Sequence, residues 1–402
     1  MQRLAALALV AVVSKPYAAW PQGNPVGPEF RVNTYTTGAQ RGPDVSVDAT
    51  GNFVVVWTSA QSGGYGVFGQ RYDSTGVPLG PEFLVSAYTV GRYELSHNIP
   101  RVASDPSGTF IVVWQSDGFD GSSLGVIGQR YSNSGDPLGP TFVVNTFTTF
   151  YQYKPDVAAD GSGNFVVAWE NLGGGGSVRA QRYAASGVPL GPEFVVAGTG
   201  YQPAVAVDPA GNFVVAWHKR LLGIYAQRYA NSGAPLGSAF KVNQFQTELT
   251  IEPALASDAA GNFVVVWSPW YGYTSGIFGR RYASSGAPLG PDFRVNTTSA
   301  ASHHAPAVSS DPGGNFVVMW WGGLPTPQIL GQRYAASGSP LGTEFSVSTT
   351  PGVKLWPSVA ADATGEFVAV WDSDLQDGSA EGVFGQRFSQ ILPVELMDFG
   401  ME

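Results

Sequence analysis

Aromatic side chains in this chain gather in short segments that also carry Asp, Glu, Asn, Gln and His. A flat ring beside hydrogen-bonding groups suits a sugar, because a sugar ring offers C–H faces for stacking and hydroxyls for hydrogen bonds. Each ring also has a structural alternative, which is to fill a gap in the core. The aromatic residues that we select as candidate ligand contacts are Phe119, Tyr151, Tyr153, Trp270, Tyr271, Tyr273, Trp321 and Trp356.

Histidine occurs only four times, and three copies lie shortly before a proline that recurs along the chain. We include these three, His97, His303 and His304, among the candidate ligand contacts. Imidazoles near carboxylates can form a metal site or an acid–base pair. The segments that follow, such as VSV and VAV, are small and apolar, so we expect no deep metal site. The charged residues expected near these histidines are Asp44, Arg101, Asp156 and Glu252.

Two acidic segments, SDGFDG at 116–121 and DSDLQDG at 372–378, have the oxygen-rich composition of calcium-binding loops. Neither has the alternating Asp spacing and distal Glu of an EF-hand loop, so a solvated turn is the favoured interpretation. Calcium stays open as an alternative, and no other cofactor is indicated. The candidate metal ligands are Asp117, Asp120, Asp372, Asp374 and Asp377.

No catalytic motif accompanies these residues. The chain lacks a G-x-S-x-G nucleophile motif and a phosphate-binding glycine loop, and without cysteine it has neither thiol chemistry nor disulfides. Its formal net charge is −9 and its Lys and Arg residues are not clustered in the sequence, which argues against a nucleic-acid partner. We therefore favour a binding module over an enzyme and assign no catalytic residue.

A unit of about 50 residues, repeated seven times, must position these side chains. In every copy a proline is followed five residues later by aspartate, three later by glycine and six later by tryptophan. The prolines are Pro43, Pro100, Pro155, Pro203, Pro253, Pro306 and Pro357, and the tryptophans are Trp57, Trp114, Trp169, Trp217, Trp267, Trp320 and Trp371.

Each unit predicts four antiparallel strands, which we call A to D. Runs such as FVVVW are apolar at every position, as a strand buried on both faces requires. The D-x-x-G-N segment before such a run has the composition of a hairpin turn. GQRY and PLGPEF complete the unit as the third and fourth strands with their turn.

Seven four-stranded units favour an all-β fold, a seven-bladed β-propeller. The chain begins with a fourth-strand piece, GPEFRVN at 27–33, while the last repeat ends after its third-strand piece, GVFGQRF. We therefore expect the N-terminal strand to complete the last blade and close the ring, which leaves no open sheet edge there.

Length variation predicts which face binds. The distance from the repeat tryptophan to the arginine of GQRY varies from 11 to 16 residues, whereas that arginine precedes the proline of PLG by seven residues in all six complete copies. The D–A connections also vary in length. The B–C and D–A connections of a propeller share one face, and variable loops on a rigid scaffold usually carry binding residues.

The residues that recur in all seven units have structural interpretations. The aspartates, such as Asp48, are expected to cap their turns rather than to form a cation-binding ring. The arginines, such as Arg71, are expected to make cation–π contacts or inter-blade hydrogen bonds. The seven tryptophans are predicted core residues.

The unit PAVAVDPAGNFVVAWHKRLLGIYAQRYANSGAPLG resembles the blades of NHL-type propellers, in which a D-x-x-G-N turn joins the two inner strands. WQSDGFDGSSLGVIGQRY at 114–131 is similar to the repeats of a group of secreted bacterial proteins. The resemblance covers residues 27 to about 388. It implies the architecture and a secreted bacterial protein, but no particular activity.

The termini carry two further expectations. Residues 1–19 have one positive residue, an apolar run and small residues, which is the pattern of a secretory signal peptide. The apolar run is too short to span a bilayer. The propeller is expected over 20–389, and the tail at 390–402 resembles the start of a sorting or further segment.

The sequence thus predicts a secreted or cell-surface module whose ligand is a glycan or another extracellular polymer. Two alternatives stay open. One is a lyase or hydrolase with its active site on the same face. The other is an interaction or adhesion scaffold, fused to or associated with a larger surface protein, which predicts a contiguous apolar patch.

Overall fold

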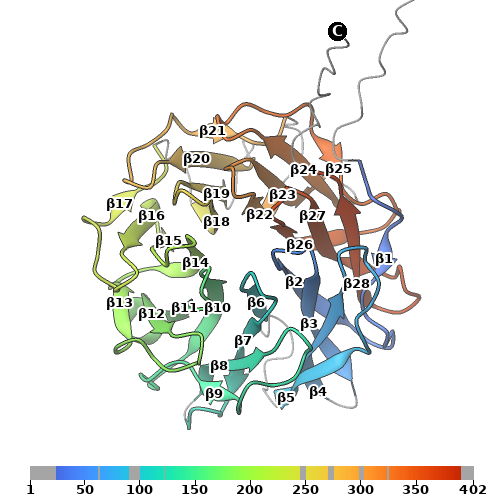
Figure 1. The fold of residues 1–402 in the computed structure, drawn as a ribbon, viewed down its shortest axis with the longest axis horizontal. Coiled ribbons are helices and arrows are strands. Elements are labelled where there is room, and N and C mark those ends of the chain that lie inside the picture. The colour runs from blue at the N-terminus through green and yellow to red at the C-terminus, as the bar shows by residue number, and fades with distance from the viewer. Residues whose placement is uncertain are drawn as a thin grey trace, which may run out of the picture.

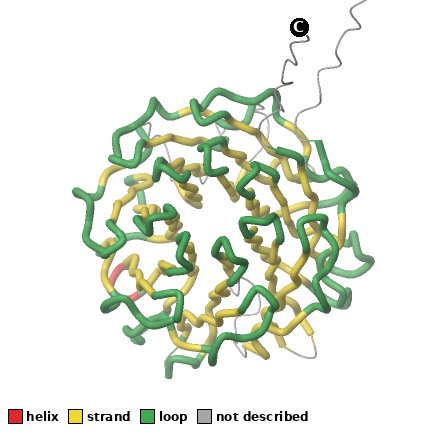
Figure 2. Tube along the Cα trace, in the orientation of Figure 1, coloured by secondary structure: helices red, strands yellow, loops and turns green. Residues whose placement is uncertain are grey.

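The computed structural model describes residues 24–61, 64–89, 100–121, 123–244, 250–269, 276–297, 303–323 and 326–390. Its strands form seven four-stranded antiparallel sheets around a common axis (Figure 1). Strands and loops account for nearly the whole trace (Figure 2), and the one helical segment in the described residues is the 3-10 turn η1 (Gly173–Gly175). The predicted seven-bladed β-propeller is confirmed.

The blades follow one another along the chain, and in each the strands run outward from the axis in the order A, B, C, D (Figure 1). Blades 1 to 3 are β2 (Gln40–Val47), β3 (Phe53–Gln61), β4 (Gly64–Tyr72) and β5 (Phe83–Thr89); β6 (Arg101–Ser104), β7 (Phe110–Asp117), β8 (Leu124–Tyr131) and β9 (Phe142–Val143); β10 (Gln152–Ala159), β11 (Phe165–Asn171), β12 (Ser177–Tyr183) and β13 (Phe194–Ala197). Blades 4 and 5 are β14 (Tyr201–Val207), β15 (Phe213–Lys219), β16 (Gly223–Tyr229) and β17 (Phe240–Lys241); β18 (Thr250–Ser257), β19 (Phe263–Pro269), β20 (Phe278–Tyr282) and β21 (Phe293–Arg294). Blades 6 and 7 are β22 (His303–Ser310), β23 (Phe316–Gly322), β24 (Gln328–Tyr334) and β25 (Phe345–Ser346); β26 (Lys354–Ala361), β27 (Phe367–Asp374), β28 (Glu381–Phe388) and β1 (Phe30–Arg31).

The N-terminal strand closes the ring as predicted. β1 pairs antiparallel with β28, so it serves as strand D of blade 7 (Figure 1). Pro25 forms a bridge with Phe388, and this pair corresponds to Tyr72 with Pro78 in blade 1. The segment NPVG at 24–27 therefore replaces the PLG turn that the last repeat lacks.

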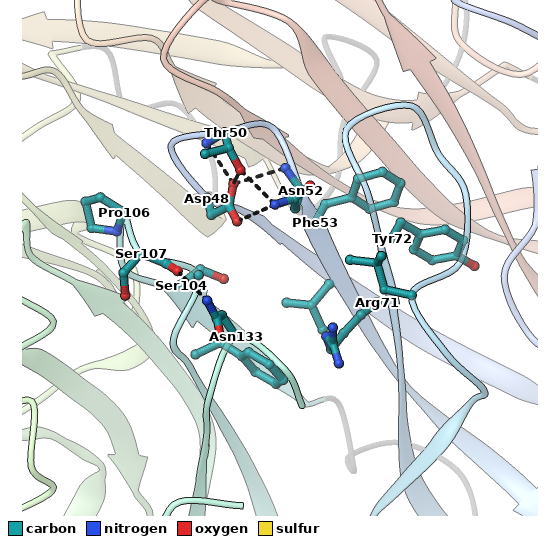
Figure 3. A pocket seen from close by; sticks show the side chains of 14 residues that line it. Asp48, Thr50, Asn52, Phe53, Arg71, Tyr72, Ser104, Pro106, Ser107 and Asn133 are labelled. Carbon is teal, nitrogen blue, oxygen red and sulfur yellow. Dashed lines mark hydrogen bonds between the residues drawn. The ribbon is translucent and has the colours of Figure 1, made fainter. Parts of the chain in front are cut away.

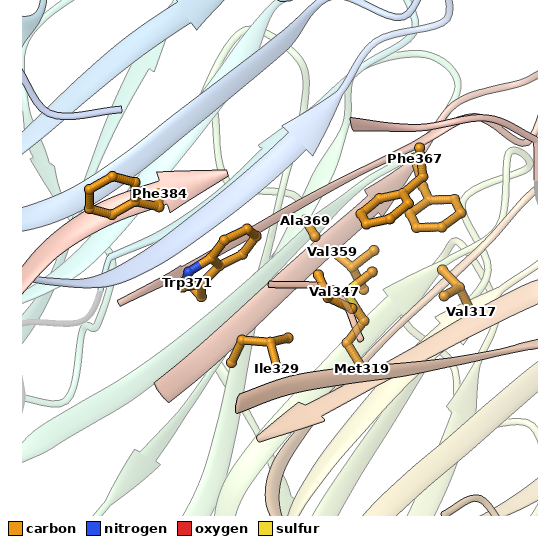
Figure 4. Close-up of a cluster of buried hydrophobic side chains, with 10 residues drawn as sticks. Val317, Met319, Ile329, Val347, Val359, Phe367, Ala369, Trp371 and Phe384 are labelled. Carbon is orange, nitrogen blue, oxygen red and sulfur yellow. The ribbon is translucent and has the colours of Figure 1, made fainter. Parts of the chain in front are cut away.

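The hydrophobic core is divided among the blade interfaces. Each of seven clusters of buried side chains joins two neighbouring blades. Between blades 6 and 7, for example, Met319 and Ile329 pack with Val359 and Trp371 (Figure 4). All seven repeat tryptophans are buried, which confirms them as core residues. Because strand B contributes to the clusters on both sides, it is apolar at every position from its first phenylalanine to the repeat tryptophan.

The D-x-x-G-N turns hold the other end of each blade. The Asp48 carboxylate accepts hydrogen bonds from the backbone N–H groups of Thr50 (2.8 Å) and Asn52 (3.0 Å), and the other six aspartates cap their turns similarly. Gly51 has φ +83°, and a Cβ there would meet the carboxylate of Asp362 from the neighbouring blade. Glycine is therefore required both by conformation and by close packing.

The repeat arginines form a belt of inter-blade hydrogen bonds. Each guanidinium donates to a backbone carbonyl of the next blade's C–D turn, as from Arg130 to Ser186 (2.7 Å). The other pairs are Arg71–Ser134, Arg182–Ser232, Arg228–Ser285, Arg281–Ser337, Arg333–Gln390 and Arg387–Thr75. The predicted structural role of these arginines is confirmed.

Within the described residues, no helix has the length and apolar character needed to cross a membrane.

Candidate functional site

Strand A carries a β-bulge at its proline, at the end of the blade that faces the variable B–C and D–A loops. We call this face the loop face. The residue directly before the proline, the pre-proline residue, has φ between 47° and 61° in all six blades where it is described. These residues are Gly42, Lys154, Gln202, Glu252, Ala305 and Trp356. Glycine adopts this conformation most easily, yet only blade 1 has one, so five side chains are held near the axis at a backbone cost.

At three blade interfaces the residue after the repeat tryptophan, the post-tryptophan residue, accepts a hydrogen bond from the pre-proline residue of the next blade. Gln115 accepts a hydrogen bond from the backbone N–H of Lys154 (3.0 Å), and Glu170 accepts one from that of Gln202 (3.1 Å). Asp372 does the same for Gly42 across the ring closure (2.9 Å). The two positions together form a circle of side chains around the axis on the loop face, which we call the axial ring.

Blades 6 and 7 make the axial ring aromatic. Trp321 is the post-tryptophan residue of blade 6, and its indole contacts the His304 ring in a tilted arrangement with ring centroids 4.7 Å apart. An indole has no acceptor, so it cannot cap the next bulge as Gln115 does. Trp321 Nε1 is buried and has no hydrogen-bond partner in the described part of the chain. Trp356 follows at the pre-proline position of blade 7 and is 43% exposed.

Blades 3 and 4 make the axial ring polar. Tyr153 lies directly opposite Glu170 in its blade and hydrogen-bonds its carboxylate. Tyr201 lies opposite His218 with ring centroids 6.0 Å apart, and its hydroxyl donates to the carbonyl of Gly175 (2.9 Å). The Lys154 ammonium lies 5.7 Å from the centre of the Tyr153 ring. Two adjacent blades thus bring five titratable side chains to one side of the axis.

Burial dominates the electrostatics of this group. It raises the pKa of Glu170, while the charge of Lys154 and the N–H of Gln202 oppose that rise. Burial lowers the pKa of His218 from 6.5 to about 4, and the positive charges of Lys154 and Arg220 add to the effect. His218 is therefore neutral at pH 7, and its buried Nε2 has no partner among the described residues.

Arg101 lies between two aspartates on the inner strands of blades 1 to 3. Its guanidinium nitrogens are 3.7 Å from Asp44 and 3.9 Å from Asp156. Burial raises the pKa of both carboxyls, to about 6 for Asp156, against the opposing charge of Arg101. Each carboxylate also accepts a backbone N–H from a neighbouring blade, Asp44 from Val102 and Asp156 from Val205. These three residues therefore form one cluster on blades 1 to 3, whereas His303 and His304, near which they were expected, lie on blade 6.

No family model matches the chain, and no curated protein matches it. The resemblances to NHL-type propellers and to secreted bacterial repeat proteins therefore stay predictions.

Several solved propellers share the fold. An ulvan lyase described as a new polysaccharide lyase family has a TM-score of 0.58 at 10% identity, over 92% of this chain and 95% of that one. A protein of unknown function from Dyadobacter fermentans has a TM-score of 0.55 at 10% identity, over 92% and 99%. The β-propeller domain of the Trilobed protease from Pyrococcus furiosus has a TM-score of 0.52 at 8% identity, over 89% and 99%. At such identities the likeness establishes the fold alone.

Other predicted contacts lie outside the axial ring or outside the described residues. Phe119 (54% exposed) and Tyr151 (38% exposed) are on connections of the loop face. His303 is almost completely buried and accepts a hydrogen bond from Trp320 Nε1 (3.1 Å). We therefore leave His303 out of the site that we propose. The residues outside the described part of the chain are His97, Trp270, Tyr271 and Tyr273.

The two acidic loops are tied into their blades. Asp120 accepts a hydrogen bond from Asn145 (2.9 Å), and Asp377 accepts the corresponding bond from Asn33 (3.1 Å). Asp372 is buried under the bulge of blade 1, and burial raises its pKa well above the usual value. Asp117 and Asp374 are exposed. No cluster of three or more His, Asp or Glu residues that could hold a metal ion occurs in the described residues.

The opposite face has small cavities between blades. One of about 270 Å³ lies between blades 1 and 2, beside Asp48, Arg71 and Asn133 (Figure 3). Another of about 290 Å³ occupies the equivalent place between blades 4 and 5. Their linings are the turn and belt residues that recur around the ring, so we regard both cavities as structural features of the blade interface.

Sequence reasoning missed the polar side of the axial ring. Lys154, Glu170 and His218 lie in the variable connections, where the prediction selected only aromatic rings and the histidines of the D–A connections, and Tyr201 lies shortly before a repeat proline. The available signal was variation within the otherwise regular block. The post-tryptophan residues are Thr58, Gln115, Glu170, His218, Ser268, Trp321 and Asp372, which differ in chemistry at one structural position.

Proposed function

We propose that this propeller binds a carbohydrate polymer at the axial ring, with its main aromatic contacts on blades 6 and 7. The observation that carries the proposal is the ring of Trp356, which is 43% exposed at the pre-proline position of blade 7, next around the axis to the Trp321–His304 ring contact of blade 6. The exposed ring provides a surface on which a sugar can stack.

The choice of residue supports the same conclusion. The left-handed conformation recurs at the pre-proline residue of all six blades where it is described, so it belongs to the fold. Among these six residues only Trp356 is aromatic, and its ring is exposed. Propellers with this fold include an ulvan lyase, which acts on a polysaccharide. That likeness supports the ligand class but does not choose between binding and cleavage.

The test is binding of the purified chain to a panel of glycans and polysaccharides, with calcium and with chelator. Trp356→Ala should weaken binding by about tenfold or more, as for other buried aromatic contacts at interfaces. Leu138→Ala removes an exposed apolar side chain from a C–D turn on the opposite face and is the matched control. Equal binding by wild type and Trp356→Ala would contradict the proposed site. Loss under chelator would assign a ligand role to the acidic loops.

A second candidate is cleavage of the same polymer. It is favoured by the hydrogen bond between Tyr153 and Glu170 and by the neutral, buried His218, since proton transfer needs such groups near a bound substrate. Incubating the polymer with the protein and measuring chain length separates the two functions. Binding without shortening supports the module, whereas shortening that Glu170→Gln abolishes supports the enzyme.

The proposal includes a location outside the cell, as the N-terminal pattern predicts. Expression of the full chain in a bacterial host, followed by assay of the medium and the cell surface, tests it. Retention of unprocessed chain inside the cell would contradict secretion.

A further inference from the structure

Positive charge is unevenly distributed around the axial ring. The chain has a net charge of −9, yet Lys154 of blade 3 and Arg220 of blade 4 both act on the imidazole of His218, and Lys219 is adjacent to Arg220 in the chain. Two carboxylates of blade 3 offset part of this charge: Glu170, which is buried and interacts with Lys154, and Asp156, which lies in the same strand as Lys154 and is shared with Arg101. The group therefore keeps an excess of positive charge.

Most other arginines are already engaged. Seven form the inter-blade belt, and Arg41, Arg179 and Arg280 pair with Glu381, Glu193 and Asp292. Arg220 is exposed in the turn between β15 and β16, and neither it nor Lys219 has a carboxylate partner within the described residues. The Lys219 ammonium lies over Tyr225, 5.3 Å from the ring centre. These cations are therefore available to a ligand at little cost.

Two of these cations act on the same side chain, that of His218. The charges of Lys154, from strand A of blade 3, and of Arg220, from the B–C turn of blade 4, both act on its imidazole. Tyr153, Tyr201 and Gln202 stand beside them on the same side of the ring and are only partly buried. Two cations from different blades, with hydroxyl and amide groups between them, have the chemistry of a site for an oxyanion.

We propose that this basic group on blades 3 and 4 binds the anionic group of an acidic polysaccharide, a carboxylate or a sulfate ester. The inference rests on the proposed function and names its ligand class. Lys154 and Arg220 contact the anion, and Tyr201 and Gln202 are placed to bond neighbouring hydroxyls. The aromatic residues of blades 6 and 7 then stack against another sugar of the same chain.

The charges near the axis also favour binding of an anion on blades 3 and 4. Arg101 is shared between Asp44 and Asp156, so this inner cluster carries two carboxylates for one guanidinium. Asp156 belongs to blade 3, but the three cations of blades 3 and 4 outnumber it, so an anion is attracted to Lys154 and Arg220 rather than to Arg101. Asymmetry of charge around the ring thus orients the polymer as well as selecting it.

The experiment compares an acidic polysaccharide with the same polymer after its carboxyl groups are reduced to alcohols or its sulfates are removed. Wild-type protein should bind the acidic form at least tenfold more tightly, and the preference should shrink as salt is raised. The Lys154→Gln/Arg220→Gln double variant should lose most of this preference. Gln202 occupies the pre-proline position of blade 4, so glutamine is compatible with the bulge. Arg220 is on the surface.

Arg31→Gln is the control, because it removes one positive charge from the exposed outer strand of blade 7, whereas the double variant removes two from blades 3 and 4. It should bind both polymers as wild type does. Equal affinity for the acidic and neutralised polymers would overturn this inference and leave the proposed function standing. Failure to bind either polymer, or any glycan of the panel, would overturn both. The reduced and desulfated samples distinguish a carboxylate from a sulfate ligand.

Discussion

Trp356 shows how much a single residue position can contribute. Its backbone has φ 50°, its indole is 43% exposed, and the equivalent residue of blade 1 is Gly42 with φ 61°. The fold therefore accepts glycine here. The bulky ring is not needed to fill the core, in contrast to the repeat tryptophans of strand B.

Replacing Trp356 should weaken glycan binding while leaving the stability of the fold nearly unchanged. For Trp356→Gly, relief of a left-handed conformation worth about 1 kcal/mol offsets a similar entropic cost of glycine. The free energy of unfolding in urea should therefore change by less than about 1 kcal/mol. Glycan binding should fall about tenfold or more, measured by calorimetry.

The contrast is Trp371→Ala in the same blade, where the side chain is fully buried. That variant should lose about 3–5 kcal/mol, because a large cavity remains in the interface. Strong destabilisation by Trp356→Gly would instead identify Trp356 as a packing residue.

His218 should make stability depend on pH. Its pKa is lowered from 6.5 to about 4 in the folded protein, so between these values the unfolded chain binds a proton that the folded one does not. Its contribution is complete above pH 6.5 and is lost as the pH falls toward 4. Relative to His218→Gln, wild type should lose up to about 3 kcal/mol over this range. Denaturant unfolding at several pH values measures the difference, and parallel curves would contradict it.

At the scale of the strand, the bulge of one blade is hydrogen-bonded to the second strand of the previous blade at three of the blade interfaces. Gln115, Glu170 and Asp372 each cap the backbone N–H of a residue in the next blade. On the opposite face, the arginine belt joins the third strand to the next C–D turn. Each blade is thus held to its neighbour at both ends, with apolar side chains between.

The belt arginines should contribute independently to the free energy of unfolding. Arg130→Met keeps the apolar stem but removes the hydrogen bond to the Ser186 carbonyl (2.7 Å). The expected loss is about 1 kcal/mol of unfolding free energy per site. Combining it with Arg387→Met, in another interface, should give an additive loss. Arg31→Met on an exposed strand serves as control, and no change in the belt variants would refute the role.

At the scale of the molecule, the ring depends on non-covalent closure. Val32 and Asn33, next to β1, are buried against blade 7 and exchange hydrogen bonds with Val383 (2.8 Å each). Deleting residues 24–33 should therefore cost on the order of 5 kcal/mol, since apolar contacts are lost and an edge of β28 is exposed. Thermal unfolding and size-exclusion chromatography measure the loss and any association.

A circular permutant tests whether covalent order matters. Asn24 and Ser389 are hydrogen-bonded (3.1 Å), so the four residues 73–76 of blade 1 can join Phe388 to Asn24 as a C–D turn. With new ends in the connection between β1 and β2, the permutant should fold and bind as wild type does. Failure to fold would show that the order of the strands contributes to folding and not only to closure.

The repeated block explains why the fold was predictable. Turn capping by Asp48, the left-handed Gly51 and the wholly apolar strand B are local consequences of residue types at fixed spacing. Seven such blocks, with a fourth strand supplied from the N-terminus, leave few arrangements other than a closed ring. The aromatic residues Trp321 and Trp356 were selected on a different ground, because they lie in the connections of variable length on the loop face.

The site itself was decided by tertiary structure. Lys154 and Arg220 act together at His218 although 66 residues separate the two cations in sequence. Lys154 and Arg220 act on the same side chain because of the bulge at Pro155, the twist of neighbouring blades and burial. None of these can be recognised from a local sequence pattern. By itself the sequence determined the blades, the turns and the loop face, because these depend on short-range geometry. Only the folded ring determined which side chains share one environment, because charge, burial and contact between blades depend on long-range packing.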